Sequence, residues 1–136
     1  MLSGGIYTWS EFRGIVRCGM LVIAALLLAS TARLAILSDF HFRQAREEQQ
    51  RGEMQAALQA YTWSIRNDFP GNPYTRKAVA GALEIIETYH SQGKKSEEIV
   101  GLREVQAALS AVRSFYQPCK DTLPIIEERL NRVSTK

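Results

Sequence analysis

Cysteine and histidine are scarce in this chain of 136 residues, with two of each. Cys18 and Cys119 lie 101 positions apart, and His41 and His90 lie 49 positions apart. Two isolated cysteines exclude a disulfide framework, and no carboxylate or further cysteine stands at metal-ligand spacing from either histidine. The sequence therefore predicts neither a disulfide-stabilised fold nor a metal site.

Catalytic motifs are also missing. The sequence has no phosphate-binding glycine loop and no nucleophile motif. Its two glutamate pairs, Glu97-Glu98 and Glu127-Glu128, are adjacent along the chain rather than one helical turn apart. Adjacent residues on a helix do not share a face, so we expect both pairs on solvated surface. The pattern predicts that the protein is not an enzyme and binds no cofactor.

A concentrated charge of one sign is absent from most of the chain. Seventeen Lys and Arg face fourteen Asp and Glu, a net charge of +3. Residues 38–136 contain 14 basic and 13 acidic side chains, with the two signs interspersed. A protein that binds a phosphate backbone needs a clustered basic surface. We therefore expect no binding to nucleic acid.

An apolar segment near the N-terminus is the most prominent feature that is present. Residues 18–32 carry no charge, and apolar residues continue after Arg33 to Leu37. Fifteen residues at about 1.5 Å each are too short for a hydrocarbon core of about 30 Å. Twenty residues from Cys18 to Leu37 suffice if Arg33 extends its guanidinium to the headgroups. The sequence predicts an N-terminal tail and membrane anchor over residues 1–37, with lipid contact through 18–37.

Two other interpretations of this segment stay open. A cleaved signal peptide would have Arg13 and Arg17 before its apolar core and Ser30-Thr31-Ala32 as its cleavage site, although the mature chain would then begin RLAIL. A buried core helix of a soluble protein is the other. For a retained anchor, we expect a single-pass protein of the cell (inner) membrane, with its domain on the extracytoplasmic side.

The pattern of residues 38–136 predicts a small all-α domain. Apolar residues recur there with the period of a helix, and no stretch alternates between apolar and polar residues as a strand would. A polar, helix-favouring run from Asp39 to Arg51 is followed by four apolar faces. These are Met54, Ala57, Leu58, Tyr61 and Ile65; Ala78, Ala82, Ile85, Ile86 and Tyr89; Ile99, Leu102, Val105, Leu109 and Val112; and Ile126, Leu130 and Val133. A second stripe of Ala107, Ala108, Ala111 and Phe115 predicts that the third of these helices packs on two sides. Asp121 or Thr122 is expected to cap the last helix.

A small–small–aromatic–small–proline spacing runs through Gly52, Ala57, Tyr61, Ser64 and Pro70. It resembles the second helix of a tetratricopeptide repeat, and FPGNPY at 69–74 resembles the turn between repeats in envelope-associated members of that group. Tyr89 and Gly93 resemble the end of the next repeat's first helix. The second repeat is degenerate: 41 residues rather than 34 separate Gly52 from Gly93, and Glu98 and Leu102 stand in the small and aromatic places. The resemblance covers about residues 42–112 and implies antiparallel helical hairpins.

Trp63 is the strongest candidate for contact with a partner. Its side chain points about 160 to 200° away from the apolar face of its helix, by the 100° step of a helical wheel. It either covers a neighbouring helix, such as the membrane-proximal one, or contacts a partner protein. Arg113 and Tyr116 are weaker candidates of the same kind.

The small pair Ala25 and Ala29 permits close helix packing in the membrane, and through it a homo-oligomer. Together these observations predict a membrane-anchored adaptor or accessory subunit, with other subunits of a membrane complex as its partners. The alternative is a soluble exported peptide-binding module, released by cleavage of the signal peptide.

Overall fold

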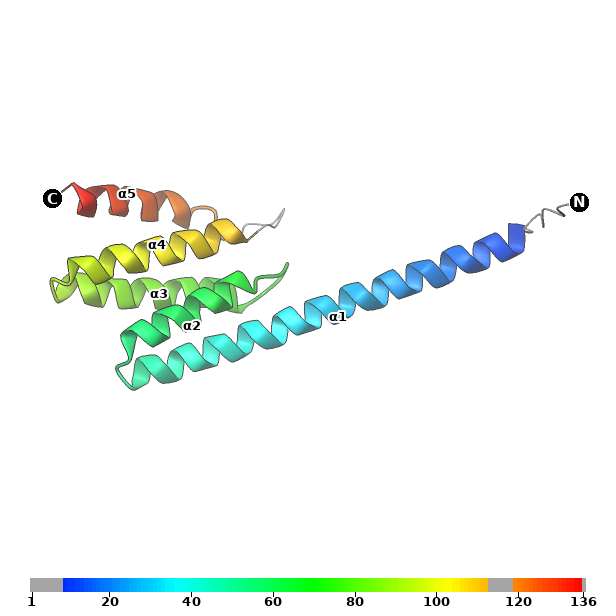
Figure 1. The fold of residues 1–136 in the computed structure, drawn as a ribbon, viewed down its shortest axis with the longest axis horizontal. Helices are drawn as coiled ribbons and strands as arrows, with labels where there is room; N and C mark the ends of the chain where they lie inside the picture. The colour runs from blue at the N-terminus through cyan, green and yellow to red at the C-terminus, as the bar shows by residue number, and fades with distance from the viewer. Residues whose placement is uncertain (1–8, 113–118, 136) are drawn as a thin grey trace, which may run out of the picture. The chain divides into compact units, whose positions relative to one another are not determined.

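The computed structural model describes residues 9–112 and 119–135 (Figure 1). Every regular element in those ranges is an α-helix, which confirms the predicted all-α class. The helices are α1 (Trp9–Gln50), α2 (Met54–Arg66), α3 (Tyr74–Ser91), α4 (Lys95–Ala111) and α5 (Thr122–Ser134). No glycine or proline stands between residues 20 and 51, so α1 continues through the boundary that the sequence suggested at Leu37.

Contacts along the chain divide it into two compact units, Met1–Arg33 and Leu34–Lys136. This boundary falls four residues before the one expected from the sequence. Leu34, Ala35 and Leu37 are already half-buried, and Ser38 is completely buried. The last residues of the predicted span therefore belong to the second unit as well.

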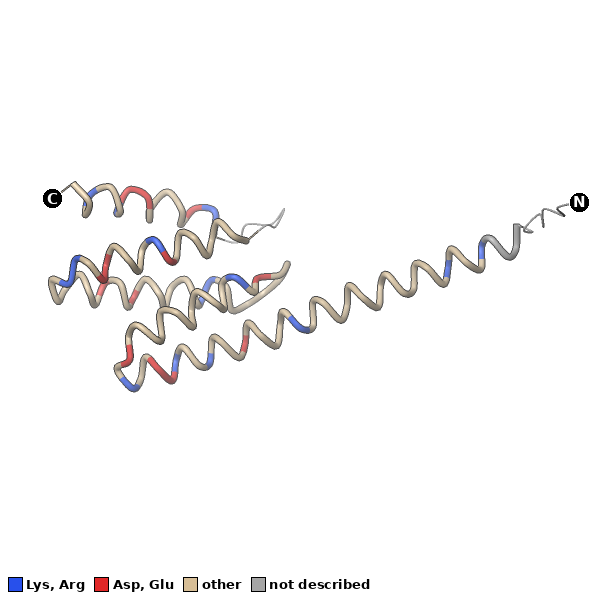
Figure 2. Tube along the Cα trace, in the orientation of Figure 1, with Lys and Arg blue, Asp and Glu red and all other residues tan. Residues whose placement is uncertain are grey.

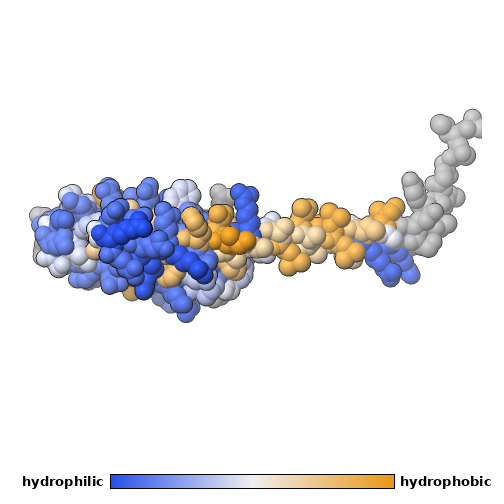
Figure 3. Space-filling view, turned by 90° about the horizontal axis from the view of Figure 1, so that it is seen from below, coloured by the Kyte–Doolittle hydropathy of each residue, from blue (hydrophilic) through white to orange (hydrophobic). Residues whose placement is uncertain are grey.

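In the first unit, the side chains of residues 13–33 are all exposed. Among the described residues, only the part of α1 from Arg13 is long and apolar enough to cross a membrane. None of its 18-residue apolar stretch is buried, unlike a helix in a soluble core. Figure 2 shows no charged residue between Arg17 and Arg33, and Figure 3 shows apolar surface there. A signal sequence would have the same properties.

Polar side chains in this stretch bond to their own helix. The Ser30 hydroxyl donates to the carbonyl of Leu26 at 2.8 Å, and Thr31 donates to that of Leu27 at 3.1 Å. Both hydroxyls are therefore satisfied without water, as a helix in lipid requires.

The second unit contains two helical hairpins with matching turns. The end of α1 joins α2 through Gly52, with φ of 80°, and α3 joins α4 through Gly93, with φ of 68°. In each turn the glycine N–H donates to the carbonyl three residues back, and the next N–H donates to the carbonyl five back. This helix ending needs a left-handed residue, which glycine adopts without strain. The two hairpins are built alike, 41 residues apart.

Tyr61 of α2 is the largest of the described side chains that are fully buried, with 1% of its surface exposed. Its hydroxyl donates to Oε1 of Gln49 on α1 at 2.7 Å. Its ring also occupies the space beside Gly81 of α3, where an added Cβ would lie 2.5 Å from the Tyr61 Cζ. The missing side chain at Gly81 thus lets Tyr61 fill the groove between helices.

Helix α4 packs on two sides, as predicted, against α2 and α3 and against α5. The expected second apolar stripe is wrong, however. Ala108 is buried, but Ala107 and Ala111 are exposed, and Phe115 lies outside the described residues. Glu98 and Gln106 of α4 instead form hydrogen bonds with Arg129 and Glu127 of α5.

Helix α5 packs through Ile126, which is 1% exposed, with Leu123 and Leu130 partly buried beside it. Asp121 is its N-cap residue, one of the two expected, but the aspartate side chain makes no capping hydrogen bond. The helix start is therefore not stabilised in the way that the sequence predicted.

Candidate functional site

A small polar network fixes the turn between α2 and α3 to α1. The Ser64 hydroxyl donates to the Ser38 carbonyl at 3.0 Å, and the Asn72 amide donates to the Ser38 hydroxyl at 2.9 Å. All three residues are at most 8% exposed. Buried polar groups of this kind must be paired, and the pairing places α1 and the loop in one arrangement.

Trp63 lies on the outer side of α2, as predicted, with 47% of its surface exposed. Its ring stacks on His41 of α1, with centroids 6.2 Å apart and planes 28° apart. The Arg66 guanidinium lies 5.3 Å from the indole centroid, and the Phe40 ring meets His41 edge-on at 5.4 Å. We call Phe40, His41, Trp63 and Arg66 the aromatic surface. Trp63 thus covers the helix that carries the apolar segment and keeps half of its surface free.

The other candidate contact residues are Arg113, Tyr116, Ala25 and Ala29. Arg113 and Tyr116 lie outside the described residues. Ala25 and Ala29 lie one turn apart on α1, with exposed side chains. This arrangement leaves both alanines accessible for helix packing.

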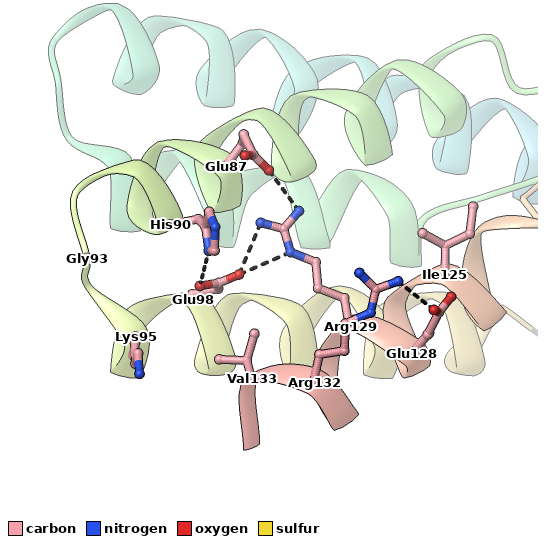
Figure 4. Close-up of a pocket in the computed structure, with 10 residues that line it drawn as sticks. All are labelled: Glu87, His90, Gly93, Lys95, Glu98, Ile125, Glu128, Arg129, Arg132 and Val133. Carbon is pink, nitrogen blue, oxygen red and sulfur yellow. Dashed lines mark hydrogen bonds and ion pairs between the residues drawn. The ribbon is translucent and has the colours of Figure 1, made fainter. Parts of the chain in front are cut away.

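A cleft of about 620 Å³ opens where the end of α3, the start of α4 and the face of α5 meet (Figure 4). Its lining contains charges of both signs and two aliphatic side chains: Glu87, His90, Gly93, Lys95, Glu98, Ile125, Glu128, Arg129, Arg132 and Val133. Ile125 is 62% exposed. The cleft can therefore accept a ligand that has both apolar and charged groups.

Glu98 lies at the base of this cleft and is 1% exposed, so the expectation of a solvated glutamate is wrong. His90 Nδ1 donates to its Oε2 at 2.9 Å, and Nε of Arg129 donates to its Oε1 at 3.0 Å (Figure 4). Burial by itself would raise the pKa of Glu98, but the hydrogen bonds from His90 and Arg129 outweigh burial and lower it. Glu98 is therefore ionised, with both oxygens engaged.

Arg129 joins α5 to two helices at once. Besides the bonds to Glu98 of α4, its Nη1 lies 2.8 Å from Oε2 of Glu87 on α3. A carboxylate held by this many donors is poorly suited to act as a general base. Among the described residues there is also no group of three or more His, Cys, Asp or Glu that could hold a metal ion. The ion pairs of Arg129 hold α5 against α3 and α4.

The sequence contains one indication of this cluster, which the expectation of a solvated Glu98 overlooks. Glu98 stands five residues after Gly93, as Ala57 stands five residues after Gly52. Both positions are buried in the structure. A glutamate in a place for a small, buried residue needs a cationic partner, and Arg129 lies 31 residues further along the chain.

No protein family, curated protein or solved structure matches this chain. The resemblance to tetratricopeptide repeats is therefore an interpretation of the residues quoted above.

Proposed function

We propose that this protein is a membrane-anchored helical adaptor, an accessory subunit that binds another protein of a membrane complex. One observation carries the proposal. The apolar part of α1, which is not buried, belongs to the same helix as Ser38 and Gln49, which hold α1 to the helical unit. An anchor and a binding unit that share a helix suit a protein that recruits a partner to a membrane.

The helical unit is proposed to be tetratricopeptide-like. Support comes from two hairpins with the same glycine turn and the same buried position five residues later. Stacked hairpins of this kind serve mainly to bind other polypeptides. With only two hairpins and α5, the unit is small, and a partner would add buried surface.

The cleft between α3, α4 and α5 is the proposed site for the partner. Ile125 offers an exposed aliphatic contact, while Lys95, Arg132 and Glu128 offer charges at its rim. A polypeptide segment with one apolar side chain between charged ones would complement this lining.

Membrane retention tests the anchor. Full-length protein should stay in the membrane fraction after a carbonate wash and should keep Met1, because residues 18–37 supply a full span. A mature chain that starts at Arg33 would contradict the anchor and favour the soluble exported module. A reporter fused after Lys136 tests the proposed extracytoplasmic side.

Co-purification from detergent tests the partner site. Ile125→Glu should reduce recovery of the partner, because a charge replaces the exposed apolar contact of the cleft. Val100→Glu is the matched control, since Val100 is 51% exposed on α4 and does not line the cleft. Equal recovery with both variants would place the partner elsewhere.

A further inference from the structure

The unit formed by residues 34–136 has an unusual distribution of side chains near its start. Inside, where helices meet, lie the small polar residues Ser38, Ser64 and Asn72. Outside, at neighbouring positions, lie Phe40 and Trp63, 59% and 47% exposed. Water favours the opposite distribution, so this aromatic surface is of the kind that a less polar medium or a partner covers.

The exposed apolar side chains there are connected to each other and to the predicted span. Ile36 is 70% exposed and lies one turn before Phe40 on α1. The Phe40 ring contacts His41, and His41 stacks on Trp63. Ile36 belongs both to the predicted span and to this unit, so the aromatic surface begins where the span ends.

The position along α1 fits the interface of a bilayer. Phe40 and His41 follow Leu37 by three and four residues, which is about 4.5 to 6 Å at 1.5 Å each. The polar zone on each side of the hydrocarbon core is about 5 to 8 Å thick. The Trp63 ring stacks on His41 and therefore lies next to this part of α1. Tryptophan is enriched in this zone, where its ring is buried in part and its N–H stays hydrated.

We propose that the aromatic surface lies in the headgroup layer of the membrane, with the Trp63 indole near the lipid carbonyls and the Arg66 guanidinium toward the phosphates. This inference depends on the proposed membrane anchor. It assigns Trp63 a lipid partner instead of a protein partner. Arg66, 5.3 Å from the indole centroid, supplies the cation that a phosphate layer attracts.

The test uses the full chain with Trp9→Phe, which leaves Trp63 as the sole tryptophan. It is reconstituted in vesicles of phosphatidylcholine and phosphatidylglycerol, with bromine on the acyl chain either near the carbonyl or near the methyl end. We expect bromine near the carbonyl to quench Trp63 about twofold more strongly than bromine near the methyl end, as for an interfacial indole. Aqueous iodide should quench it weakly.

Two matched variants without native tryptophans calibrate the experiment. Val100→Trp reports an exposed site on α4, and Leu27→Trp reports the middle of the predicted span. Strong iodide quenching of Trp63, equal to that of Val100→Trp, would overturn the proposal in favour of water. Protection of Trp63 from both quenchers would overturn it in favour of a second copy or a protein partner.

The Leu27→Trp variant separates the two proposals. If bromine near the methyl end quenches it while neither bromolipid quenches Trp63, the anchor stands and the interfacial position of Trp63 is wrong. If no bromolipid quenches Leu27→Trp, the anchor and this inference are both overturned.

Discussion

Ala57 and Glu98 occupy equivalent buried positions in the two hairpins, although one side chain is small and apolar and the other is charged. Each stands five residues after the glycine of its turn, and each is buried. Alanine fits because a methyl group lets helices approach closely. Glutamate fits because His90 and Arg129 pair with its carboxylate. The same backbone position is thus compatible with a small side chain or with a fully paired charge, and a change to either residue has predictable effects.

Ala57→Leu should destabilise the helical unit by about 1 to 3 kcal/mol, because extra methylenes in a packed core force neighbours to move. Ala107→Leu is the matched control, since Ala107 is exposed on α4 and its replacement should change little. Thermal unfolding of both variants measures the difference. Equal melting temperatures would show that Ala57 is not at a close helix contact.

Because of Glu98, the stability of the helical unit should depend on pH in the acid range. Its pKa is lowered in the folded state from an ordinary value of 4.5. The stability it contributes is therefore present above about pH 4.5 and is lost as the pH falls through the lower, folded pKa. Glu98→Gln should lower stability at pH 7 and flatten its decline in this acid range, whereas Glu47→Gln, at an exposed site on α1, should not. Denaturant titrations at several pH values measure both effects, and an unchanged acid profile in Glu98→Gln would contradict the role of the ion pair.

At the scale of elements, local patterns predicted much of the structure. Helices α2 and α3 end near Pro70 and Gly93, as expected, because apolar period and helix-ending residues are both local signals. The outward position of Trp63 also followed from the helical period. The cluster around Glu98 did not, because Arg129 lies on a different helix 31 residues away and no periodicity encodes such a pairing.

Helix α5 should depend on this ion pair. Arg129→Met leaves the buried Glu98 with only its His90 partner and also removes the bond to Glu87. Breaking a buried ion pair costs about 3 to 5 kcal/mol. We expect Arg129→Met to lower the free energy of unfolding by an amount that approaches this range. Arg132→Met, which removes only an exposed i, i+4 pair with Glu128, should cost about 0.3 to 0.5 kcal/mol.

The double variant Glu98→Leu with Arg129→Met provides the check on that prediction. It removes both charges, so it should be more stable than Arg129→Met alone. Chemical denaturation of the single and double variants measures the coupling. Strict additivity of the two changes would mean that the residues do not stabilise each other.

At the scale of the whole molecule, the apolar segment and the helical unit share helix α1. The sequence predicted an apolar segment and a helical domain, with their boundary after Leu37. It could not place the boundary more closely, because an apolar run does not indicate which of its residues pack on a neighbouring helix. The structure includes residues from Leu34 onward in the second unit. Ser38, Phe42 and Gln49 of α1 all contact α2 or the residues after it.

A fragment of residues 34–136 should therefore fold cooperatively, whereas a fragment of residues 54–136 should be much less stable. The shorter fragment exposes Tyr61 and leaves Ser64 and Asn72 without their Ser38 partner. Water can replace these hydrogen bonds, but the apolar surface that α1 covers would be lost from the core, at about 25 cal/mol for each Å² exposed. Thermal unfolding followed by circular dichroism compares the fragments, and equal midpoints would show that α1 is dispensable.

The ion pair between Glu98 and Arg129 also sets an order of events during synthesis. The ribosome makes α3 and α4 before α5, so Glu98 is made 31 residues before the Arg129 that pairs with it. During that interval, burying its carboxylate carries a desolvation cost that only His90 offsets. We therefore expect the second hairpin to reach its final packing only once α5 has emerged. A nascent chain that stops before Arg129 lacks one of the two partners of the Glu98 carboxylate, so its α4 should pack less firmly than in the finished protein.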